Sequence, residues 1–471
     1  MNKYKRLISN TAIFAAGTFT SKLLVLLLMP LYTSILSTEQ YGVSDLITQT
    51  ANLLIPLACV GVCDAIFRFT IDCEDKKKVF STALAVIFAG SAILALLSPL
   101  FELFDIFDGY SWLICAYVIC ANLHSACAHY VRAQGRSVVF SAQGIINTAL
   151  TIIYNLIFLV VFDMGVTGYV LSVVAADLTV TVGLVLVTKI YEDISFSLFD
   201  KKVLRDMLRF SIPYIPTTML WLITSVSDRF VVTYFCGEEA NGLYSAAYKI
   251  PTLLTLMCTV FIEAWQLSSV RDGGSSLEER QGFFGRVYKD YLCIMIAGSS
   301  FLIASSQIFT LILLADSYFE SWQYVPILAM ATMFSALSSF MGSVYFLEKK
   351  SVWSMLTTFT GAFVNVILNF VMIPKHGAMG AAVATLISYM TVYAVRVVDT
   401  RRYVKFSTHN IKLVINTFLL ALQSIILLSE VRYSFFVSLG LFCLVAILNL
   451  GGIVSTILKI LRKFLKKTKN N

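Results

Sequence analysis

Residues 17–42 read GTFTSKLLVLLLMPLYTSILSTEQYG, an apolar run that carries one cation, Lys22, and ends at an acidic corner. About 20 mostly apolar residues cross a hydrocarbon core of ~30 Å as an α-helix, so this stretch has the length of a transmembrane span. The whole chain has the same character: its 471 residues are 58% hydrophobic and only 14% charged, with a mean hydropathy of +0.79. Soluble domains carry about 25% charged residues, so this chain lacks the polar surface needed to fold in water. We therefore predict an all-α polytopic membrane protein.

Breaks in the hydropathy pattern predict about fourteen transmembrane helices. The basic start MNKYKRLISN could be misread as a secretory signal, but the apolar run continues to about Ile35, well beyond the 7–15 residues of a signal core. We expect it to be retained as the first helix. The spans are expected at residues 8–36, 41–67, 79–104, 111–131, 138–162, 166–188, 207–236, 241–268, 287–315, 322–347, 352–373, 377–398, 411–429 and 435–458.

Lysine and arginine concentrate in alternate connections between the predicted helices. The basic set includes both terminal tails, VRAQGRS at 131–137 and RVVDTRRYVK at 396–405, whereas the connections of the other set contain only Lys375 and Arg432. Because Lys and Arg favour the cytoplasmic side, both termini are predicted to be cytoplasmic, in agreement with an even number of spans. The net charge of +8 is accordingly assigned to orientation and to anionic-lipid contact, and not to nucleic acid.

The acidic corner recurs in the second half of the chain. Glu39-x-x-Gly42 in STEQYG corresponds to Glu239-x-x-Gly242 in GEEANG, and further matches follow in the same order: GRSVVF at 135–140 with KKSVWS at 349–354, and Gly165-x-x-Gly168 with Gly377-x-x-Gly380. Together they predict that helices 1–6 are duplicated as helices 7–12. The corners are predicted to be structural turns, where Gly relaxes the backbone, in preference to sites of direct chemistry.

The duplication predicts the domain organisation. Residues 1–200 would form an N-terminal lobe of helices 1–6, residues 201–405 a C-terminal lobe of helices 7–12, and residues 406–471 helices 13–14 with a basic cytoplasmic tail. Because each copy contains an even number of spans, the two lobes would be related by a pseudo-twofold axis along the membrane normal. Transporters with this symmetry rock two halves about a central cavity.

Several stretches resemble the polysaccharide-transporter (Wzx-type) oligosaccharide flippases of the multidrug/oligosaccharidyl-lipid/polysaccharide superfamily. They are the first span with its internal lysine, VRAQGRS, SIPYIPTTMLWLITSVSDRFVVTYF at 211–235 and GLYSAAYKI at 242–250. The resemblance implies a bacterial plasma (inner) membrane protein with two six-helix lobes around a cation-lined cavity. Such a protein would move a polyprenyl-diphosphate-linked oligosaccharide, a precursor of cell-surface polysaccharide, across the membrane by alternating access. Its partners would be membrane lipids, the glycan substrate, a polysaccharide polymerase and glycosyltransferases.

Three cations inside the predicted helices are the candidate substrate-binding residues: Lys22, Arg229 and Lys249. A charge at mid-bilayer costs at least ~2.5–3.5 kcal/mol on insertion scales, so it usually faces a cavity or a partner. A diphosphate that leaves water needs cationic counter-charges, and Arg can bind phosphate oxygens through two parallel hydrogen bonds. In the competing interpretation, Arg229 and Lys249 form an ion-pair staple with Asp228. In the first interpretation Asp228 is a neutraliser.

Three acids inside the predicted helices, Asp177, Asp228 and Glu263, are candidates for coupling to a Na+ or H+ gradient. Asp177 in the sixth span is the best of them, because Glu263 lies near the inner end of the eighth span, where it can meet cytoplasmic water. His124 and His129 are five residues apart and do not share a helical face, so a metal or proton-relay role is disfavoured for them.

Two alternative functions remain open at this stage. The intramembrane acids would also suit a drug/cation:ion antiporter of the same superfamily, although a cation exporter needs an acid-lined cavity and the excess of Lys and Arg suits an anionic ligand. A non-transporting membrane scaffold for envelope assembly is the alternative from another class. The chain contains no P-loop, no Ser/His/Asp constellation and no zinc-type or CxxC spacing among its ten cysteines. We therefore predict no enzyme activity, no metal site and no cofactor other than a coupling ion.

Overall fold

The computed structural model describes residues 26–72, 75–103, 109–195, 198–212, 215–272, 277–348 and 350–469. Every regular element within these ranges is helical. Nine helices there are long and apolar enough to cross a membrane, and ten if the bent pair Thr38–Ala58 and Val62–Ile71 counts as one span. The prediction of an all-α polytopic membrane protein is confirmed. The number fourteen stays a prediction, because part of the first span lies outside the described residues and other spans are divided into shorter helices.

The described chain forms two compact units. The first extends to Phe230 and includes Glu238–Gly242, and the second comprises Val231–Gly237 and the chain from Leu243 onward. The division into three parts at residues 200 and 405 stays a prediction.

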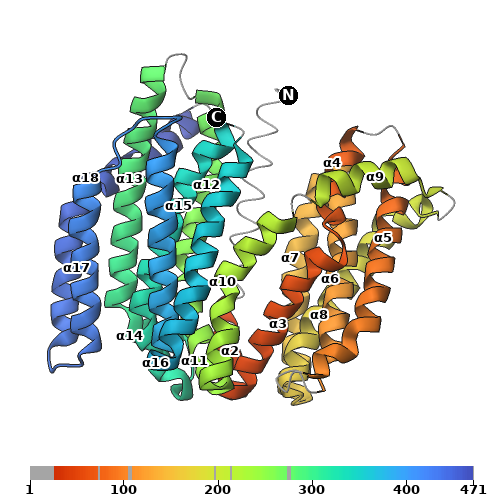
Figure 1. Cartoon of the computed structure of the whole chain (residues 1–471), viewed down its shortest axis with the longest axis horizontal. Coiled ribbons are helices and arrows are strands. Elements are labelled where there is room, and N and C mark those ends of the chain that lie inside the picture. Colours follow the sequence, from red (N-terminus) through yellow and green to blue (C-terminus); the bar gives the residue numbers. More distant parts are fainter. Residues whose placement is uncertain are drawn as a thin grey trace. The chain divides into compact units, whose positions relative to one another are not determined.

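The first unit is a bundle in which α6 contacts most of the other helices (Figure 1). Its elements are α2 (Met29–Ile35), α3 (Thr38–Ala58), α4 (Val62–Asp72), α5 (Lys76–Leu97), α6 (Ser111–Ala133), α7 (Ser137–Asn155), α8 (Gly165–Thr188), α9 (Lys201–Ser211) and the part of α10 (Ile215–Cys236) up to Phe230. Helix α6 packs against α3, α4, α5, α7 and α8, and α9 lies across one end of the bundle against α4 and α5. A stacked pair, Phe80 on Tyr130, lies in the apolar core with its ring centroids 4.3 Å apart.

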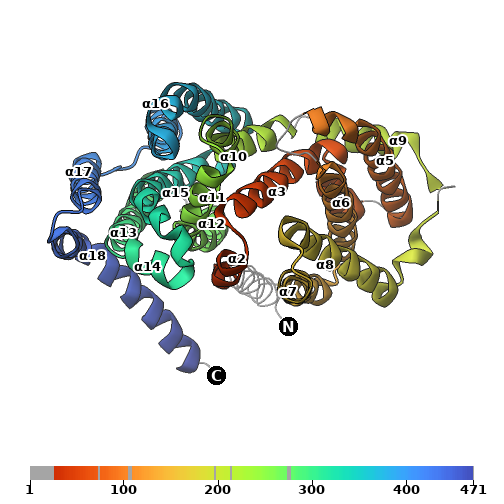
Figure 2. The same ribbon diagram turned by 90° about the horizontal axis from the view of Figure 1, so that it is seen from below.

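The second unit is built around α13 and α15. Its elements are the rest of α10 and of α11 (Glu238–Lys249), then α12 (Thr252–Asp272), α13 (Leu277–Ala304), α14 (Ser306–Leu313), α15 (Val325–Leu347), α16 (Ser351–Thr400), α17 (Asn410–Leu428) and α18 (Ser434–Lys469). Helices α17 and α18 lie side by side at the margin of this unit, as both views show (Figures 1 and 2). Phe340 of α15 is completely buried, with Trp265, Tyr288 and Tyr291 around it at centroid distances of 5.0, 5.2 and 5.6 Å.

Short sequence signals fix several helix ends. Ser37 and Gln40 form a capping box at the start of α3, in which each side chain accepts a hydrogen bond from the other residue's backbone N–H at 3.1 Å. At the other end of α3, Val60 and Gly61 have positive φ values of 49° and 67°, so the chain cannot continue as a helix. Helix α4 starts at Val62 after a bend of 48°. The predicted span 41–67 is therefore a broken helix.

Helix α16 is a helical hairpin whose turn lies at Gly377. This glycine has φ of 58° and ψ of −147°, which is outside the helical region. Side chains on either side of it meet across the hairpin: Asn365 donates to Thr385 at 3.4 Å, and the Arg396 guanidinium donates to Thr357 at 3.0 Å. The two arms of the hairpin match the predicted spans 352–373 and 377–398.

The two acidic corners pack directly against each other in the first unit. A Cβ atom added to Gly42 would overlap the carbonyl oxygen of Glu238, and one added to Gly242 would overlap the carbonyl oxygen of Thr38. Asn241 strengthens the contact, because its buried side-chain amide donates to the carbonyl of Gly42 at 3.0 Å. The glycines therefore allow the starts of α3 and α11 to touch backbone to backbone.

Candidate functional site

An ion pair between α3 and α10 is the most deeply buried charged site among those predicted site residues whose side chains the structure describes. Arg229 Nε lies 2.8 Å from Asp45 Oδ2, and Arg229 Nη1 lies 3.9 Å from Asp228 Oδ1. The exposed fractions of Arg229, Asp45 and Asp228 are only 5%, 4% and 1%. Gln49 donates its side-chain N–H to the other oxygen of Asp45 at 3.2 Å, and Asp228 accepts the backbone N–H of Arg229 at 3.0 Å. The guanidinium thus lies near two carboxylates, which lowers the cost of burying it.

The predicted substrate-binding cations lie in different parts of the chain. Arg229 belongs to the first unit, whereas Lys249 is half-buried in the last turn of α11 in the second unit. The helix breaks directly after Lys249, because Pro251 separates α11 from α12. Lys22 lies outside the described residues.

Sequence reasoning missed Asp45, the partner nearest to Arg229. It predicted that Asp228 would neutralise Arg229, and the structure places Asp228 3.9 Å away but Asp45 at 2.8 Å. Asp45 lies inside the predicted span 41–67, so a search for every carboxylate within the spans would have found it. The ion pair itself could not be predicted, because Asp45 and Arg229 come from helices that are far apart in the sequence.

A second polar cluster joins α6, α7 and α8 around Asp177. The Asp177 carboxylate lies 3.0 Å from Nδ1 of His124 and accepts the side-chain N–H of Asn147 at 2.8 Å. The other nitrogen of His124, Nε2, lies 2.6 Å from the side-chain oxygen of Gln143. Asp177 is only 7% exposed, so it is a buried carboxylate, and its Oδ1 faces both an imidazole and an amide. Such a group can take up a proton or a small cation when its partners rearrange.

The two histidines of α6 contact different carboxylates. His124 lies against Asp177, whereas His129 Nε2 lies 4.0 Å from Asp64 Oδ1. The sequence argument disfavoured a relay role for His124 because it considered the histidines as a pair, and it did not foresee the contact of His124 with α8. Glu263 lies in α12, and its side chain is outside the described part. Across the residues that the structure describes, no group of three or more His, Cys, Asp or Glu side chains is arranged to hold a metal ion.

Arg396 is a further buried cation that sequence reasoning assigned to a basic connection. It lies in the second arm of α16 with 8% exposure, and its guanidinium donates to the Ser338 carbonyl at 2.9 Å and to the Thr357 and Thr358 hydroxyls at 3.0 Å. The contact is close: a Cβ added to Gly342 would lie 2.7 Å from one of its nitrogens. Arg396 therefore connects α15 with both arms of the hairpin. Sequence reasoning missed these contacts because Arg396 lies at the end of the predicted span 377–398 and was counted with the basic connection that follows.

Comparison with known proteins assigns the chain to a family. The model of the family described as "Polysaccharide biosynthesis protein" matches residues 7–265. Among curated proteins, an uncharacterized membrane protein of Methanocaldococcus jannaschii is 23% identical over 262 residues, which cover 54% of this chain and 51% of that protein. The chain thus matches about half the length of that relative.

Solved structures share the fold over most of the chain. A lipid II flippase, MurJ, in an inward closed conformation has a TM-score of 0.72 and 14% identity, and covers 95% of this chain and 100% of its own. An outward-facing multidrug resistance MATE family transporter of the MOP superfamily has a TM-score of 0.61 and 15% identity, over 83% and 95% of the two chains. A MOP superfamily transporter from Pyrococcus furiosus, described as having a binding pocket of reverse polarity, has a TM-score of 0.60 and 15% identity over the same shares. At these identities the likeness shows the fold.

Proposed function

The chain belongs to the polysaccharide biosynthesis protein family, and from that premise we propose that it is a flippase for a lipid-linked oligosaccharide. Its substrate would be a polyprenyl-diphosphate-linked precursor of a cell-surface polysaccharide, moved across the bacterial plasma membrane by alternating access. The observation that carries the proposal is that a member of a polysaccharide biosynthesis family has the fold of a lipid II flippase over 95% of its length. In this proposal both termini are cytoplasmic. Glycosyltransferases would supply the precursor, and a polymerase would act on it after its release.

The chemistry of the proposed substrate fits the cations of the spans. A diphosphate carries two or more negative charges, and its transfer from water requires fixed counter-charges in the protein. In the proposal Lys22, Arg229 and Lys249 supply them. Arg229 already has two carboxylates within 4 Å, so the phosphate would have to compete with Asp45 for the guanidinium. In the proposal the ion pair is intact in one conformation and open in another, so the diphosphate binds the open one better, which is the requirement for driving a conformational change.

The Asp177 cluster supports a coupling role within the same proposal. Its carboxylate contacts His124 and Asn147 between three helices of the first unit, so gain or loss of a proton or a Na+ ion there would alter how these helices pack. This geometry supports our proposal that Asp177 is the coupling residue. Glu263 and Asp228 remain weaker candidates, since Asp228 already lies beside Arg229.

The first test is mass spectrometry of lipid extracts from cells depleted of the protein. We expect a polyprenyl-diphosphate glycan to accumulate in a form that an externally added sugar-binding probe cannot reach, and the mass would identify the sugar. If no such lipid accumulates while sensitivity to toxic cations rises, the antiporter is the correct function. If neither changes although the surface polysaccharide is lost, the scaffold alternative is favoured.

Glycolipid translocation by purified variants in liposomes tests the roles of the individual residues. We expect Arg229→Gln and Lys249→Gln to reduce translocation of the glycolipid at least tenfold, whereas Lys375→Gln, which removes an exposed lysine of the α16 turn, should not. We expect Asp177→Asn to abolish the response to an imposed pH or Na+ gradient, with Asp163→Asn, an exposed residue between α7 and α8, as its control. Full gradient-driven transport by Asp177→Asn would contradict the coupling role.

A further inference from the structure

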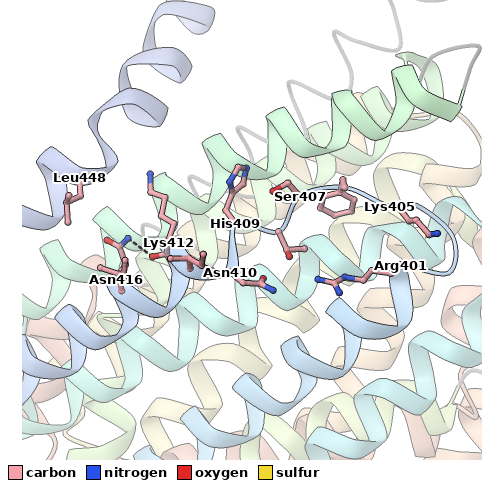
Figure 3. A pocket seen from close by; sticks show the side chains of 12 residues that line it. Arg401, Lys405, Ser407, His409, Asn410, Lys412, Asn416 and Leu448 are labelled. Atoms are coloured by element: carbon pink, nitrogen blue, oxygen red, sulfur yellow. Dashed lines mark hydrogen bonds between the residues drawn. The ribbon is translucent and has the colours of Figure 1, made fainter.

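A cavity of about 1080 Å³ lies in the second unit, where the connection after α16 leads into α17. Figure 3 shows that its lining comes from the end of α16, from the connection and from the first turns of α17, with Leu448 of α18 near Asn416. The residues that line it are outside the ion-pair site, the Asp177 cluster and the Arg396 contacts described above. None of the proposed transport chemistry uses this cavity.

The polar part of the cavity is basic. Arg401, Lys405, His409 and Lys412 line it, and none of the described residues of its lining is acidic. Arg401 and Lys405 are exposed, whereas Lys412 is half-buried and its ammonium donates to the thiol of Cys293 in α13 at 3.1 Å. Burial, followed by the charges of Lys289 and Lys412, lowers the pKa of the His409 imidazole, as expected where cations gather. An anion would relieve the mutual repulsion of these groups.

The start of α17 adds backbone donors to the same cavity. His409 is its N-cap, with φ of 47°, and no side chain caps the helix there. The starts of α3 and α9 are capped by Ser37 and Asp200, whereas α6, α7, α8, α11 and α16 share with α17 the lack of a side-chain cap. The first N–H groups of a helix have no intrahelical partner and carry partial positive charge. Asn410, the first residue of α17, lines the cavity (Figure 3).

The other part of the cavity is apolar and faces the lipid. Ile411, Ile415 and Leu448 line it with exposed fractions of 80%, 50% and 47%. Helix α17 has 19 residues and is apolar enough to cross a membrane, so at 1.5 Å per residue it spans roughly the hydrocarbon thickness. Its first turn, and with it the basic part of the cavity, therefore lies at the depth of lipid headgroups. The predicted orientation places this end on the cytoplasmic side.

We propose that this cavity binds one anionic glycerophospholipid of the cytoplasmic leaflet. The phosphodiester lies among Arg401, Lys405 and Lys412, and the acyl chains follow Ile411, Ile415 and Leu448 along α17 and α18. Basic pockets between transmembrane helices are suited to such headgroups, because cations hold the phosphate while the helices hold the chains. A soluble phosphate compound would leave the apolar side chains uncovered, and a zwitterionic lipid would leave the basic charges uncompensated. The proposal does not depend on the transported substrate.

Native mass spectrometry and thermal unfolding of the full-length protein test this assignment. The probes are phosphatidylglycerol, phosphatidylcholine and glycerol phosphate, added to delipidated protein in neutral detergent. We expect phosphatidylglycerol alone to bind at one-to-one stoichiometry and to raise the unfolding temperature. The double variant Arg401→Gln/Lys405→Gln should lose about thirtyfold in affinity, which corresponds to two cationic contacts near the membrane surface.

A matched control makes the result decisive. Lys201→Gln/Lys202→Gln removes the same charge from exposed lysines at the start of α9 and should leave phosphatidylglycerol binding within twofold of the wild type. Equal losses in the two double variants would show a non-specific charge effect and overturn the proposal. Equal binding of phosphatidylcholine would also overturn it, as would binding of glycerol phosphate with the same affinity. Displacement of phosphatidylglycerol by an equimolar polyprenyl diphosphate would assign the cavity to the substrate instead.

Discussion

Arg229 lies between Asp45 and Asp228, and the three buried charges are energetically coupled. Removal of one partner costs about 3–5 kcal/mol where it leaves a buried charge uncompensated, but Asp228 stays 3.9 Å from the guanidinium when Asp45 is neutralised. We therefore expect Asp45→Asn to lower the free energy of unfolding by about 1–3 kcal/mol, the cost of losing the 2.8 Å contact to a charged group. Thermal or denaturant unfolding of the purified protein in detergent measures it, and Asp163→Asn, at an exposed corner, should change it by less than about 0.5 kcal/mol.

The triple variant Asp45→Asn/Asp228→Asn/Arg229→Gln separates a structural role from a functional one. Because all three buried groups are then neutral, much of the stability lost in the single variants should return. If the cluster is only an ion-pair staple, translocation should return with stability. Our proposal requires the opposite result: a stable protein that does not translocate the glycolipid, because the guanidinium that meets the diphosphate is gone. A triple variant as active as the wild type would remove Arg229 from the binding site.

At the scale of elements, the contact between the two acidic corners depends on their glycines. A methyl group at Gly242 would meet the backbone carbonyl of Thr38, which cannot move aside as a side-chain end could. We expect Gly242→Ala to destabilise the first unit by about 1–3 kcal/mol, the usual cost of overpacking. Gly144→Ala in α7 is the control, because nothing lies within 4 Å of the added carbon and Ala is the better helix former. Unfolding midpoints that fall equally in both variants would contradict the steric argument.

The same contact brings two carboxyl groups together and gives a prediction about pH. Burial, and then the charge of Glu39, raise the pKa of the Glu238 carboxyl. The folded unit therefore binds this proton more tightly than the unfolded chain, so its stability falls as pH rises from the ordinary glutamate value of about 4.3 through the raised pKa. We expect Glu238→Gln to raise the unfolding temperature at pH 7 by on the order of 1 °C. The gain should vanish near pH 4. Glu239→Gln, at a more exposed neighbour, should show no such difference, and an equal gain at both pH values would contradict the assignment.

The positions of many helices along the chain could be predicted from hydropathy, whereas the contacts between helices could not. The predicted spans 111–131, 166–188 and 411–429 differ by at most two residues at either end from α6, α8 and α17, because apolar length alone determines them. The proline at position 251 predicted the break between α11 and α12. Ion pairs and cross-helix hydrogen bonds depend instead on which faces meet, and a single sequence does not contain that information. For this reason Asp45, His124 and Arg396 were missed or misassigned.

For the whole molecule, the distribution of basic residues predicts one testable topology. Lysine and arginine lie in alternate connections, and an even number of spans returns the chain to the same side. The segment Asp316–Tyr324 follows α14 in a connection with no basic residue, whereas α9 begins with two lysines. The positive-inside rule then places the first segment outside and the start of α9 in the cytoplasm.

Single cysteines introduced at exposed positions test this topology in a variant without the native cysteines. We expect Ser317→Cys, in the connection after α14, to react with a membrane-impermeant maleimide in intact cells. Lys201→Cys, at the start of α9, should react only after the membrane is opened. As a control for expression, both introduced cysteines should react with the maleimide once the protein is unfolded. The reverse pattern would invert the molecule, and the basic cavity beside α17 would then face the outer leaflet. Labelling of both positions in intact cells would be incompatible with the alternation on which the orientation rests.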